Sequence, residues 1–181
     1  MKLLNMIVCC DNNYGIGINN ELPWLIKEEM RLFKNKTIGN NNNCVIMGKN
    51  TYRSIDTKFF PLKNRKNIIL SSTMNETEIN NDNVMLCNTH YDLIEYIKES
   101  DHDVCWIIGG SQIYHFFLNY YKNLINEIHI SVINKDYNCD TFFPKINKFD
   151  FEIKETKHYN SFMHFVYVNK TINHDRNTDY R

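Results

Sequence analysis

The chain has 181 residues, 43% of them apolar and 13% aromatic, which is long enough for one domain with a sizeable core and too apolar for general disorder. Its 21 basic and 21 acidic residues cancel, and no basic stripe is visible, so we expect no nucleic-acid partner. No apolar run approaches the roughly 20 residues of a membrane helix, so we expect no membrane contact either.

Short, nearly continuous apolar segments alternate with helical segments in the first two thirds of the chain. Such segments are typical of strands buried on both faces of a parallel sheet. The expected strands are residues 3–10, 44–47, 67–71, 84–87 and 104–108. The expected helices are residues 26–35, 49–55, 91–99 and 111–119. This alternation predicts an α/β fold with right-handed crossovers.

The pattern changes after residue 125, where three further strands are expected at 127–133, 151–158 and 164–171. The last two have no helix between them and predict a hairpin near Asn160 and an antiparallel edge. We therefore expect a single-domain α/β protein with a mainly parallel, mixed sheet of about eight strands and helices on both faces. This domain spans residues 1–170, and the polar residues 171–181 are expected to be a disordered tail or a linker.

The six cysteines are scattered, with no CxxC pair and no histidine at ligand spacing. We therefore expect no metal site, and most of the thiols should be reduced and buried, as in a cytoplasmic protein. The first ten residues hold one early lysine and a short apolar stretch without a cleavage site. They favour a first strand over a signal peptide.

The loop after the first strand carries Gly15 and Gly17 and ends at Trp24. Two glycines flanking one apolar residue suit a mobile loop or a close approach of the backbone to a ligand. An ordinary crossover connection, anchored in the core by Trp24, is an equally good interpretation of this segment alone.

Glu29 is the sharpest anomaly in the sequence. Ile26, Met30 and Phe33 form an apolar helical stripe that should face the sheet, and Glu29 belongs to the same stripe. A carboxylate desolvated there has a raised pKa and can donate a proton near neutral pH. Taken alone, the residues favour the alternative that Glu29, beside Glu28, only interacts with the positive end of the helix.

Two segments, 45–51 and 106–114, each combine a strand, a glycine turn and a helix start. Backbone N–H groups at such helix starts bind phosphate, and Lys49 adds a positive charge. Ser111 is a candidate cap for the second helix. Neither a Walker loop nor a GxGxxG fingerprint is present, so a dinucleotide would bind in another manner. For each segment alone, a capped helix after a buried strand is the plainer interpretation.

Arg65 ends the segment PLKNR before the strand at 67–71. Its guanidinium offers a bidentate fork for a carboxylate. A lone arginine beside two lysines is more often a solvated loop charge, which is what the local sequence favours.

Together these motifs resemble the dihydrofolate reductase family, from Leu3 to about Lys170. The matching segments are GIG…LPW (15–24), E-x-x-x-F (29–33), VIMGKNT (45–51), PLKNR (61–65), IILSS (68–72), WIIGGSQIY (106–114) and CDTFFP (139–144). The resemblance implies reduction of 7,8-dihydrofolate to tetrahydrofolate by hydride transfer from NADPH to C6, with Glu29 promoting protonation at N5. Such an enzyme supports one-carbon metabolism and thymidylate and purine synthesis, and antifolates are its expected inhibitors.

The resemblance also implies which residues form the site. The catalytic set is Glu29, with Leu22 and Trp24 from a lid loop and Ser131, whose hydroxyl orients Glu29. The substrate would be bound by Ile7, Val8, Cys9, Glu29, Met30, Phe33, Ile55, Leu62, Arg65, Ile108, Tyr114 and Ser131. NADPH would be bound by Cys9, Ile16, Gly17, Leu22, Gly48, Lys49, Asn50, Thr51, Leu70, Ser71, Ser72, Asn88, Ile108, Gly109, Gly110, Ser111, Gln112, Ile113 and Tyr114. Arg65 would bind the α-carboxylate of the glutamate tail, and the Gly109–Gly110 bond would be cis.

Several positions depart from the family pattern. Ser131 replaces the usual threonine, and Cys9 replaces a small residue, often alanine. Ser72 and Asn88 stand where relatives often carry cations for the 2′-phosphate of NADPH, which leaves Lys49 to read that phosphate. Tyr52 replaces a tryptophan, to which we attach no consequence.

Three alternatives remain open from the sequence. A pyrimidine-type reductase of riboflavin synthesis uses the same fold and NADPH, but does not need Glu29 and Arg65. A non-catalytic dinucleotide-binding relative has no reason to keep an acid on an apolar stripe. The domain is expected to be a monomer unless it is part of a larger polypeptide, such as a fusion with thymidylate synthase.

Overall fold

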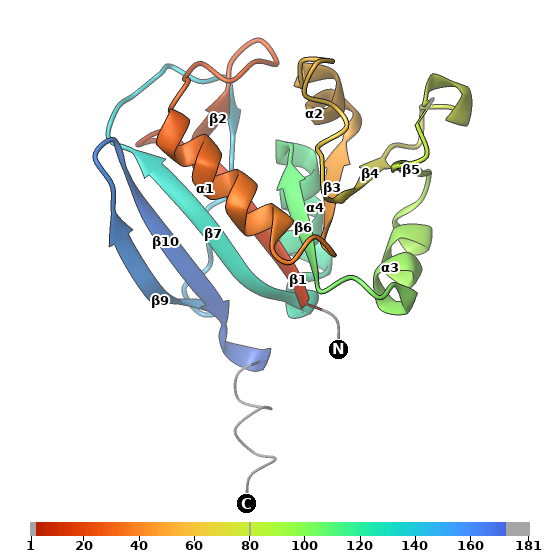
Figure 1. Cartoon of the computed structure of the whole chain (residues 1–181). Helices are drawn as coiled ribbons and strands as arrows, with labels where there is room; N and C mark the ends of the chain where they lie inside the picture. The colour runs from red at the N-terminus through yellow and green to blue at the C-terminus, as the bar shows by residue number, and fades with distance from the viewer. Residues whose placement is uncertain (1–2, 80, 173–181) are drawn as a thin grey trace, which may run out of the picture.

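The computed structural model describes residues 3–79 and 81–172, and eight of its strands form one sheet. These strands are β1 (Leu3–Cys10), β3 (Cys44–Gly48), β4 (Lys66–Leu70), β5 (Val84–Cys87), β6 (Val104–Gly109), β7 (Ile125–Ile133), β9 (Phe151–His158) and β10 (Phe162–Asn169). Their order is β5-β4-β3-β6-β1-β7-β10-β9 (Figure 1). The strands from β5 to β7 pair in parallel, whereas β10 is antiparallel to both β7 and β9. The predicted mainly parallel sheet with an antiparallel C-terminal edge is confirmed.

Helices cover both faces of this sheet, as predicted. They are α1 (Lys27–Ile38), α2 (Lys49–Ser54), α3 (His90–Glu99) and α4 (Ser111–Tyr120), with short 3-10 helices η1 (Glu76–Glu78) and η2 (Lys122–Leu124). In Figure 1, α1 crosses in front of the sheet and α4 lies behind it. Each face has its own cluster of buried side chains. One cluster packs with residues of α3 and α4, and the other with residues of α1 and α2.

The strand β1 shows why the parallel strands read as continuous apolar segments. Met6 and Val8 belong to the cluster on the α3 and α4 side, and Ile7 between them belongs to the cluster on the α1 and α2 side. Because successive side chains point to opposite faces, a strand buried on both faces is apolar at nearly every position.

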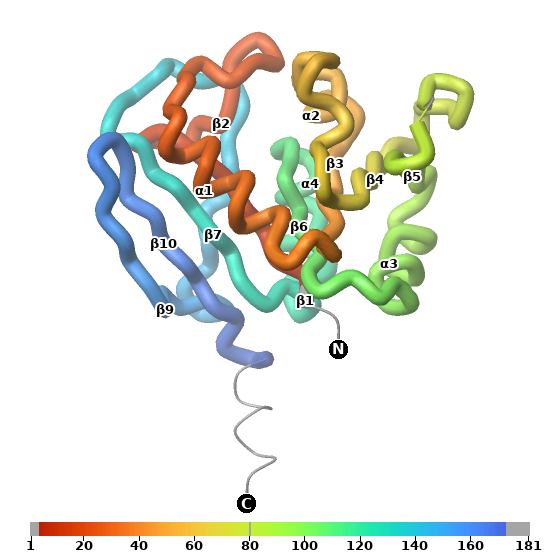
Figure 2. Tube along the Cα trace, in the orientation of Figure 1, coloured from red at the N-terminus to blue at the C-terminus, as the bar shows by residue number. Residues whose placement is uncertain are grey.

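A small second sheet was not predicted. Strand β2 (Gly15–Gly17) pairs with β8 (Thr141–Phe142), and Figure 2 shows these two segments side by side near the start of α1. Both strands are too short to show an alternating pattern. A side chain at Gly15 would collide with Cys139, so the close approach of the two segments requires glycine there. The first part of the predicted mobile loop is therefore anchored.

Asp11 holds this small sheet in place. Its carboxylate accepts hydrogen bonds from the backbone N–H groups of Asn13 and Gly15, both at 2.8 Å, and of Tyr137 at 3.1 Å. Burial raises the pKa of Asp11, but these three bonds outweigh it and leave the pKa below the ordinary value. The segment before β2 is thereby tied to the connection between β7 and β8.

We expect Asp11→Ala to lower the free energy of unfolding by about 2–4 kcal/mol, because three buried N–H groups lose a charged acceptor. Since the folded-state pKa is depressed, this stabilisation is present above the ordinary aspartate pKa of about 4 and is lost as the pH falls below it. Denaturant unfolding at several pH values measures the difference. Asp11→Asn, which keeps one acceptor oxygen, should lose less, and equal stability of the parent and the alanine variant would contradict the assignment.

The C-terminal hairpin agrees with its prediction. The turn between β9 and β10 is closed by a hydrogen bond from Tyr159 N–H to the Phe162 carbonyl at 2.9 Å, on either side of Asn160. Strand β10 ends at Asn169 rather than at 171, where the Asn169 side chain accepts bonds from the backbone and the hydroxyl of Thr171. Most of the predicted tail, residues 173–181, lies outside the described residues.

No disulfide joins any of the six cysteines, all of which lie in the described part of the chain, and Cys10, Cys44, Cys87 and Cys105 are buried, as predicted for most of them. No helix in the described part of the chain is long and apolar enough to cross a membrane.

Candidate active site

Glu29 lies in the first turn of α1 and is buried, with 8% of its surface exposed. Burial raises its pKa, and the side chains of Ser131 and Cys9 oppose this shift when they donate hydrogen bonds to the carboxylate. The prediction of a desolvated carboxylate is confirmed. The alternative of a solvated charge at the helix end is wrong, because the side chain points toward β1 and β7, which carry Cys9 and Ser131.

The predicted apolar stripe of α1 is only partly correct. The buried residues of α1 are Glu29 and Thr37, and Phe33 between them packs against the cluster on this face. These positions are four residues apart and lie on one side of a helix. Met30 is one position, about 100°, further round and is 49% exposed, so the prediction that it faces the sheet is wrong.

The residues predicted to surround the substrate are mostly brought together. Ile7 belongs to the cluster on the α1 and α2 side of the sheet. Four other predicted residues pack against this cluster, namely Phe33, Ile55, Leu62 and Ile108. The side chain of Val8 lies in the cluster on the opposite face of the sheet, so it does not line this pocket. Tyr114 also packs in the opposite cluster, but its hydroxyl donates to the Ile7 carbonyl at 2.7 Å. Tyr114 therefore contacts the backbone of the pocket from the other face of the sheet.

Trp24 reaches the site through Cys9. Its indole donates a hydrogen bond to the Cys9 sulfur, and the Cys9 thiol in turn contacts Glu29. Burial, followed by the charge of Glu29, raises the pKa of Cys9, so this cysteine remains a neutral thiol. Trp24 also packs edge-on against Tyr137, with the ring centroids 5.1 Å apart. Leu22 of the same loop is 65% exposed and is not brought into this group.

Arg65 is not the solvated loop charge that its neighbours suggested. It is 7% exposed, and its guanidinium donates to Thr37 Oγ1 at 2.6 Å and to the Lys63 carbonyl at 3.1 Å. Burial lowers its pKa to about 10, so it stays charged at neutral pH. Among the described residues, no ion pair includes Arg65. A buried cation without an acidic partner is a suitable receptor for an anionic ligand.

The two strand–glycine–helix junctions lie side by side, because β3 and β6 are neighbours and Met47 pairs with Gly109. The Gly109–Gly110 bond is cis, as the resemblance implied, and Gly109 has a φ of +120°. A Cβ at Gly110 would lie 3.1 Å from Thr51 Oγ1, and one at Gly48 would lie 3.0 Å from Ile113. The backbones of the two junctions therefore lie close to each other's helices.

Ser111 does not cap α4 as predicted. The N-cap is Gly110, and the Ser111 hydroxyl donates to the Phe142 carbonyl of β8 at 2.6 Å. Neither α2 nor α4 has a side-chain cap among the described residues, so the N–H groups of both first turns are not used by a capping side chain. Gln112, predicted to contact the cofactor, is exposed beside them.

A third group extends this site along the ends of β4 and β5. Lys49 Nζ donates to Thr73 Oγ1 at 3.0 Å, and the Thr73 hydroxyl lies 3.4 Å from Ser71 Oγ. The Asn88 amide donates to the Ser71 carbonyl at 2.9 Å. Three other residues predicted to bind the cofactor adjoin these in sequence, namely Leu70, Ser72 and Asn50. Two more, Ile16 and Gly17, belong to β2. Thr73 was not predicted as a residue of this site. The available signal was a second hydroxyl two residues after Ser71.

The sequence analysis also missed two histidines next to the acid. His164 Nδ1 lies 3.1 Å from Ser131 Oγ, and His164 Nε2 lies 3.2 Å from His129 Nδ1. Both rings are buried, with 2% and 3% of their surface exposed for His129 and His164. The available signal was that Glu127, His129 and Ser131 alternate along one strand, which places polar side chains on a buried face.

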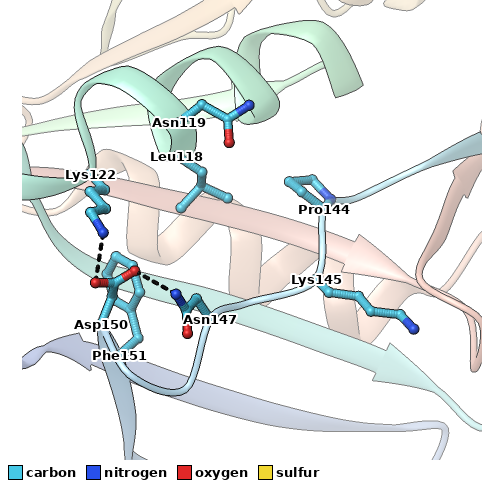
Figure 3. Close-up of a pocket in the computed structure, with 8 residues that line it drawn as sticks. All are labelled: Leu118, Asn119, Lys122, Pro144, Lys145, Asn147, Asp150 and Phe151. Carbon is cyan, nitrogen blue, oxygen red and sulfur yellow. Dashed lines mark hydrogen bonds and ion pairs between the residues drawn. The ribbon is translucent and has the colours of Figure 1, made fainter.

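A separate hollow lies away from this site, between the end of α4 and the segment before β9. Figure 3 shows Lys122 and Asn147 directed toward Asp150 beside Leu118 and Pro144, and Lys122 Nζ lies 2.7 Å from the Asp150 carboxylate. Lys122 and Asp150 are paired with each other, and the hollow holds none of the predicted site residues.

The chain is similar to known proteins over almost its whole length. The profile of the family described as dihydrofolate reductase matches residues 3–174. A dihydrofolate reductase of Heliothis virescens is 36% identical over 156 residues, which cover 83% of each chain. One of Ureaplasma parvum is 37% identical over 168 residues, covering 93% of this chain and 98% of its own. A bifunctional dihydrofolate reductase-thymidylate synthase of Plasmodium berghei is 39% identical over 158 residues, covering 81% of this chain and 27% of the longer protein.

Proposed function

Because this chain belongs to the dihydrofolate reductase family, we propose that it reduces 7,8-dihydrofolate to tetrahydrofolate and that Glu29 promotes protonation at N5. The observation that carries this proposal is the burial of Glu29 beside an apolar cluster, with Cys9 and Ser131 in contact with its carboxyl group. NADPH, when bound, supplies the hydride that reduces C6.

The chain's own residues position and protonate the substrate. The raised pKa of Glu29 keeps a larger fraction of its carboxyl group protonated near neutral pH. Phe33, Ile55 and Leu62 offer an apolar surface that excludes water from a flat ring system. Arg65 binds the α-carboxylate of the glutamate tail. A pyrimidine-type substrate would leave this buried cation unused, so the presence of Arg65 favours a folate.

The residues at the two junctions fit NADPH. The uncapped starts of α2 and α4 present N–H groups for phosphate, and the glycines at 48, 109 and 110 let the two junctions approach each other closely. Lys49, held by Thr73, is the cation that would bind the adenosine 2′-phosphate. Leu70, Ser71, Ser72 and Asn88 line the same edge.

The activity is tested by following NADPH oxidation spectrophotometrically in the presence of dihydrofolate. We expect turnover by the parent protein. Tight NADPH binding without turnover would contradict the proposal and would favour a non-catalytic dinucleotide-binding protein. Turnover of a pyrimidine substrate in preference to dihydrofolate would favour the riboflavin-type reductase.

Cofactor choice gives a separate prediction for Lys49. Replacing it in Lys49→Met should lower the ratio of kcat/KM for NADPH to that for NADH by roughly tenfold, because a charge-assisted hydrogen bond to the 2′-phosphate is lost. Lys58→Met, which removes an exposed lysine elsewhere, should leave the ratio unchanged. An unchanged ratio in Lys49→Met would show that this residue does not read the 2′-phosphate.

We also propose that the domain, residues 1–170, works as a monomer in the cytoplasm or as the reductase part of a longer polypeptide. The lack of disulfides among the described cysteines supports a reducing compartment. The Plasmodium berghei relative shows that fusion proteins exist in this family.

A further inference from the structure

A continuous row of polar side chains leads from Glu29 to the molecular surface. Ser131 contacts Glu29 and lies 3.1 Å from His164, which lies 3.2 Å from His129. His129 Nε2 lies 3.1 Å from the Glu127 carboxylate, and the other oxygen of that carboxylate accepts from Lys154 at 3.0 Å. Lys154 is 60% exposed, so the row runs from the buried acid to solvent.

The sheet builds this row. Glu127, His129 and Ser131 occupy alternate positions of β7 and therefore point to the same face. His164 lies directly opposite Ser131 on β10. Trp106 on β6 packs edge-on against the His129 ring, with the centroids 5.1 Å apart, and restricts its orientation. All four ring nitrogens of the two histidines have hydrogen-bond partners, which leaves none of them to bind a metal.

The ionised end of the row determines how its protons are arranged. The hydrogen bond with His129 lowers the pKa of Glu127 to about 2, so Glu127 is a carboxylate that only accepts. Burial lowers the pKa of His164 to about 4, and the positive charges of Lys36 and Lys157 act in the same direction, so that ring is neutral. A neutral imidazole has one donor nitrogen and one acceptor nitrogen.

When His129 is neutral as well as His164, each hydrogen bond follows from the one before it. His129 donates from Nε2 to Glu127, so its Nδ1 accepts from His164 Nε2. His164 Nδ1 must then accept from the Ser131 hydroxyl, whose single proton is thereby used. The Ser131 oxygen is left as an acceptor toward Glu29, and only a protonated Glu29 can donate to it.

We propose that His164 and His129 are positioning residues that hold the Ser131 hydroxyl as an acceptor and so favour the protonated, proton-donating form of Glu29. This inference rests on the proposed function of Glu29. Moving one proton along each of the three bonds between Glu29 and His129 gives the opposite arrangement, with a Glu29 carboxylate and a His129 imidazolium beside Glu127, and no proton is gained or lost. The row therefore couples the protonation of the acid to His129.

Other ionisable groups face the two ends of the row. Near Glu29 these are the thiols of Cys9 and Cys10 and the hydroxyl of Tyr114, which are neutral because burial raises the pKa of each. Near His164 they are Lys36 of α1 and Lys157 of β9, whose positive charges oppose protonation of the ring. The neutral state of His164 is thus favoured from both neighbouring elements.

The first test measures the protons directly in the cofactor-free protein. NMR of protein labelled with nitrogen-15 in its histidines distinguishes the two neutral tautomers. We expect the proton on Nε2 in both His129 and His164 near neutral pH. A proton on Nδ1 of His164 would overturn the inference, because the Ser131 hydroxyl would then be free to donate to Glu29.

The second test is the pH dependence of turnover. His164→Asn keeps a polar group near Ser131 but cannot bridge to His129. We expect its turnover to fall roughly tenfold below that of the parent at about pH 8 and to approach the parent at about pH 5, because the acid loses its protonated form at a lower pH. Glu127→Gln removes the charged end of the row and should change the pH profile of turnover in the same direction. This second variant keeps the test decisive if His164→Asn does not fold.

The control is His158→Gln, which removes an exposed histidine from the same hairpin and should keep the parent profile. Parent-like profiles for folded Glu127→Gln and His164→Asn would overturn the inference while leaving the proposed function intact. A parent protein without turnover would refute the proposed function, and the tautomers measured by NMR would still decide the hydrogen-bond directions.

Discussion

Glu29→Gln should lower turnover by about 10²- to 10⁴-fold at neutral pH, the usual contribution of a general acid. The amide keeps the size of the side chain but cannot promote protonation at N5. Activity should recover in part at low pH, where a fraction of the substrate is already protonated in solution. The measurement is turnover of dihydrofolate across a pH series, beside Glu28→Gln as the neighbouring carboxylate outside the site.

A measurement of thermal stability distinguishes a loss of turnover caused by the missing acid from one caused by misfolding of Glu29→Gln. Because burial raises the folded-state pKa of Glu29, the ionised carboxylate costs stability above that pKa, and the cost disappears as the pH falls through it. Glu29→Gln removes the cost, so its Tm at neutral pH should equal or exceed that of the parent. A variant with full turnover at neutral pH would contradict the role proposed for Glu29.

Arg65→Gln should raise KM for dihydrofolate by roughly 10- to 100-fold with a smaller effect on kcat. The charge-assisted contact between the buried guanidinium and the tail carboxylate is lost, and a hydrogen bond to a charged group contributes about 1.5–3 kcal/mol net of its exchange with water. Thr37 and the Lys63 carbonyl fix the position of the guanidinium. We therefore expect that no neighbouring cation takes over its contact in the variant.

A truncated substrate gives the sharpest control for Arg65. A dihydropterin that lacks the glutamate tail should bind the parent and Arg65→Gln with the same affinity, whereas the full substrate should distinguish them. Lys63→Gln, which removes the exposed neighbouring charge but keeps the carbonyl that accepts from Arg65, should behave as the parent. An unchanged KM for the full substrate in Arg65→Gln would refute the proposed contact.

Local sequence was sufficient for most of the fold. Most strands of the parallel sheet are nearly continuous apolar segments because both of their faces are buried, and this pattern is visible without any knowledge of their partners. The glycines at 48, 109 and 110 marked the two junctions because close backbone approach leaves no room for a Cβ. The sheet of β2 and β8 was missed because strands of three and two residues carry no periodic pattern.

The sequence by itself determined that Glu29 is an acid on the apolar side of a helix and that two helices start at glycine turns in one sheet. Only the tertiary structure decided which side of α1 is buried, and with it the exposure of Met30. It also decided that Arg65 lies buried on Thr37 and that His164 completes the row behind Glu29. These features depend on contacts between residues far apart in the chain, and the rotation of a helix against a sheet is set by packing rather than by local periodicity.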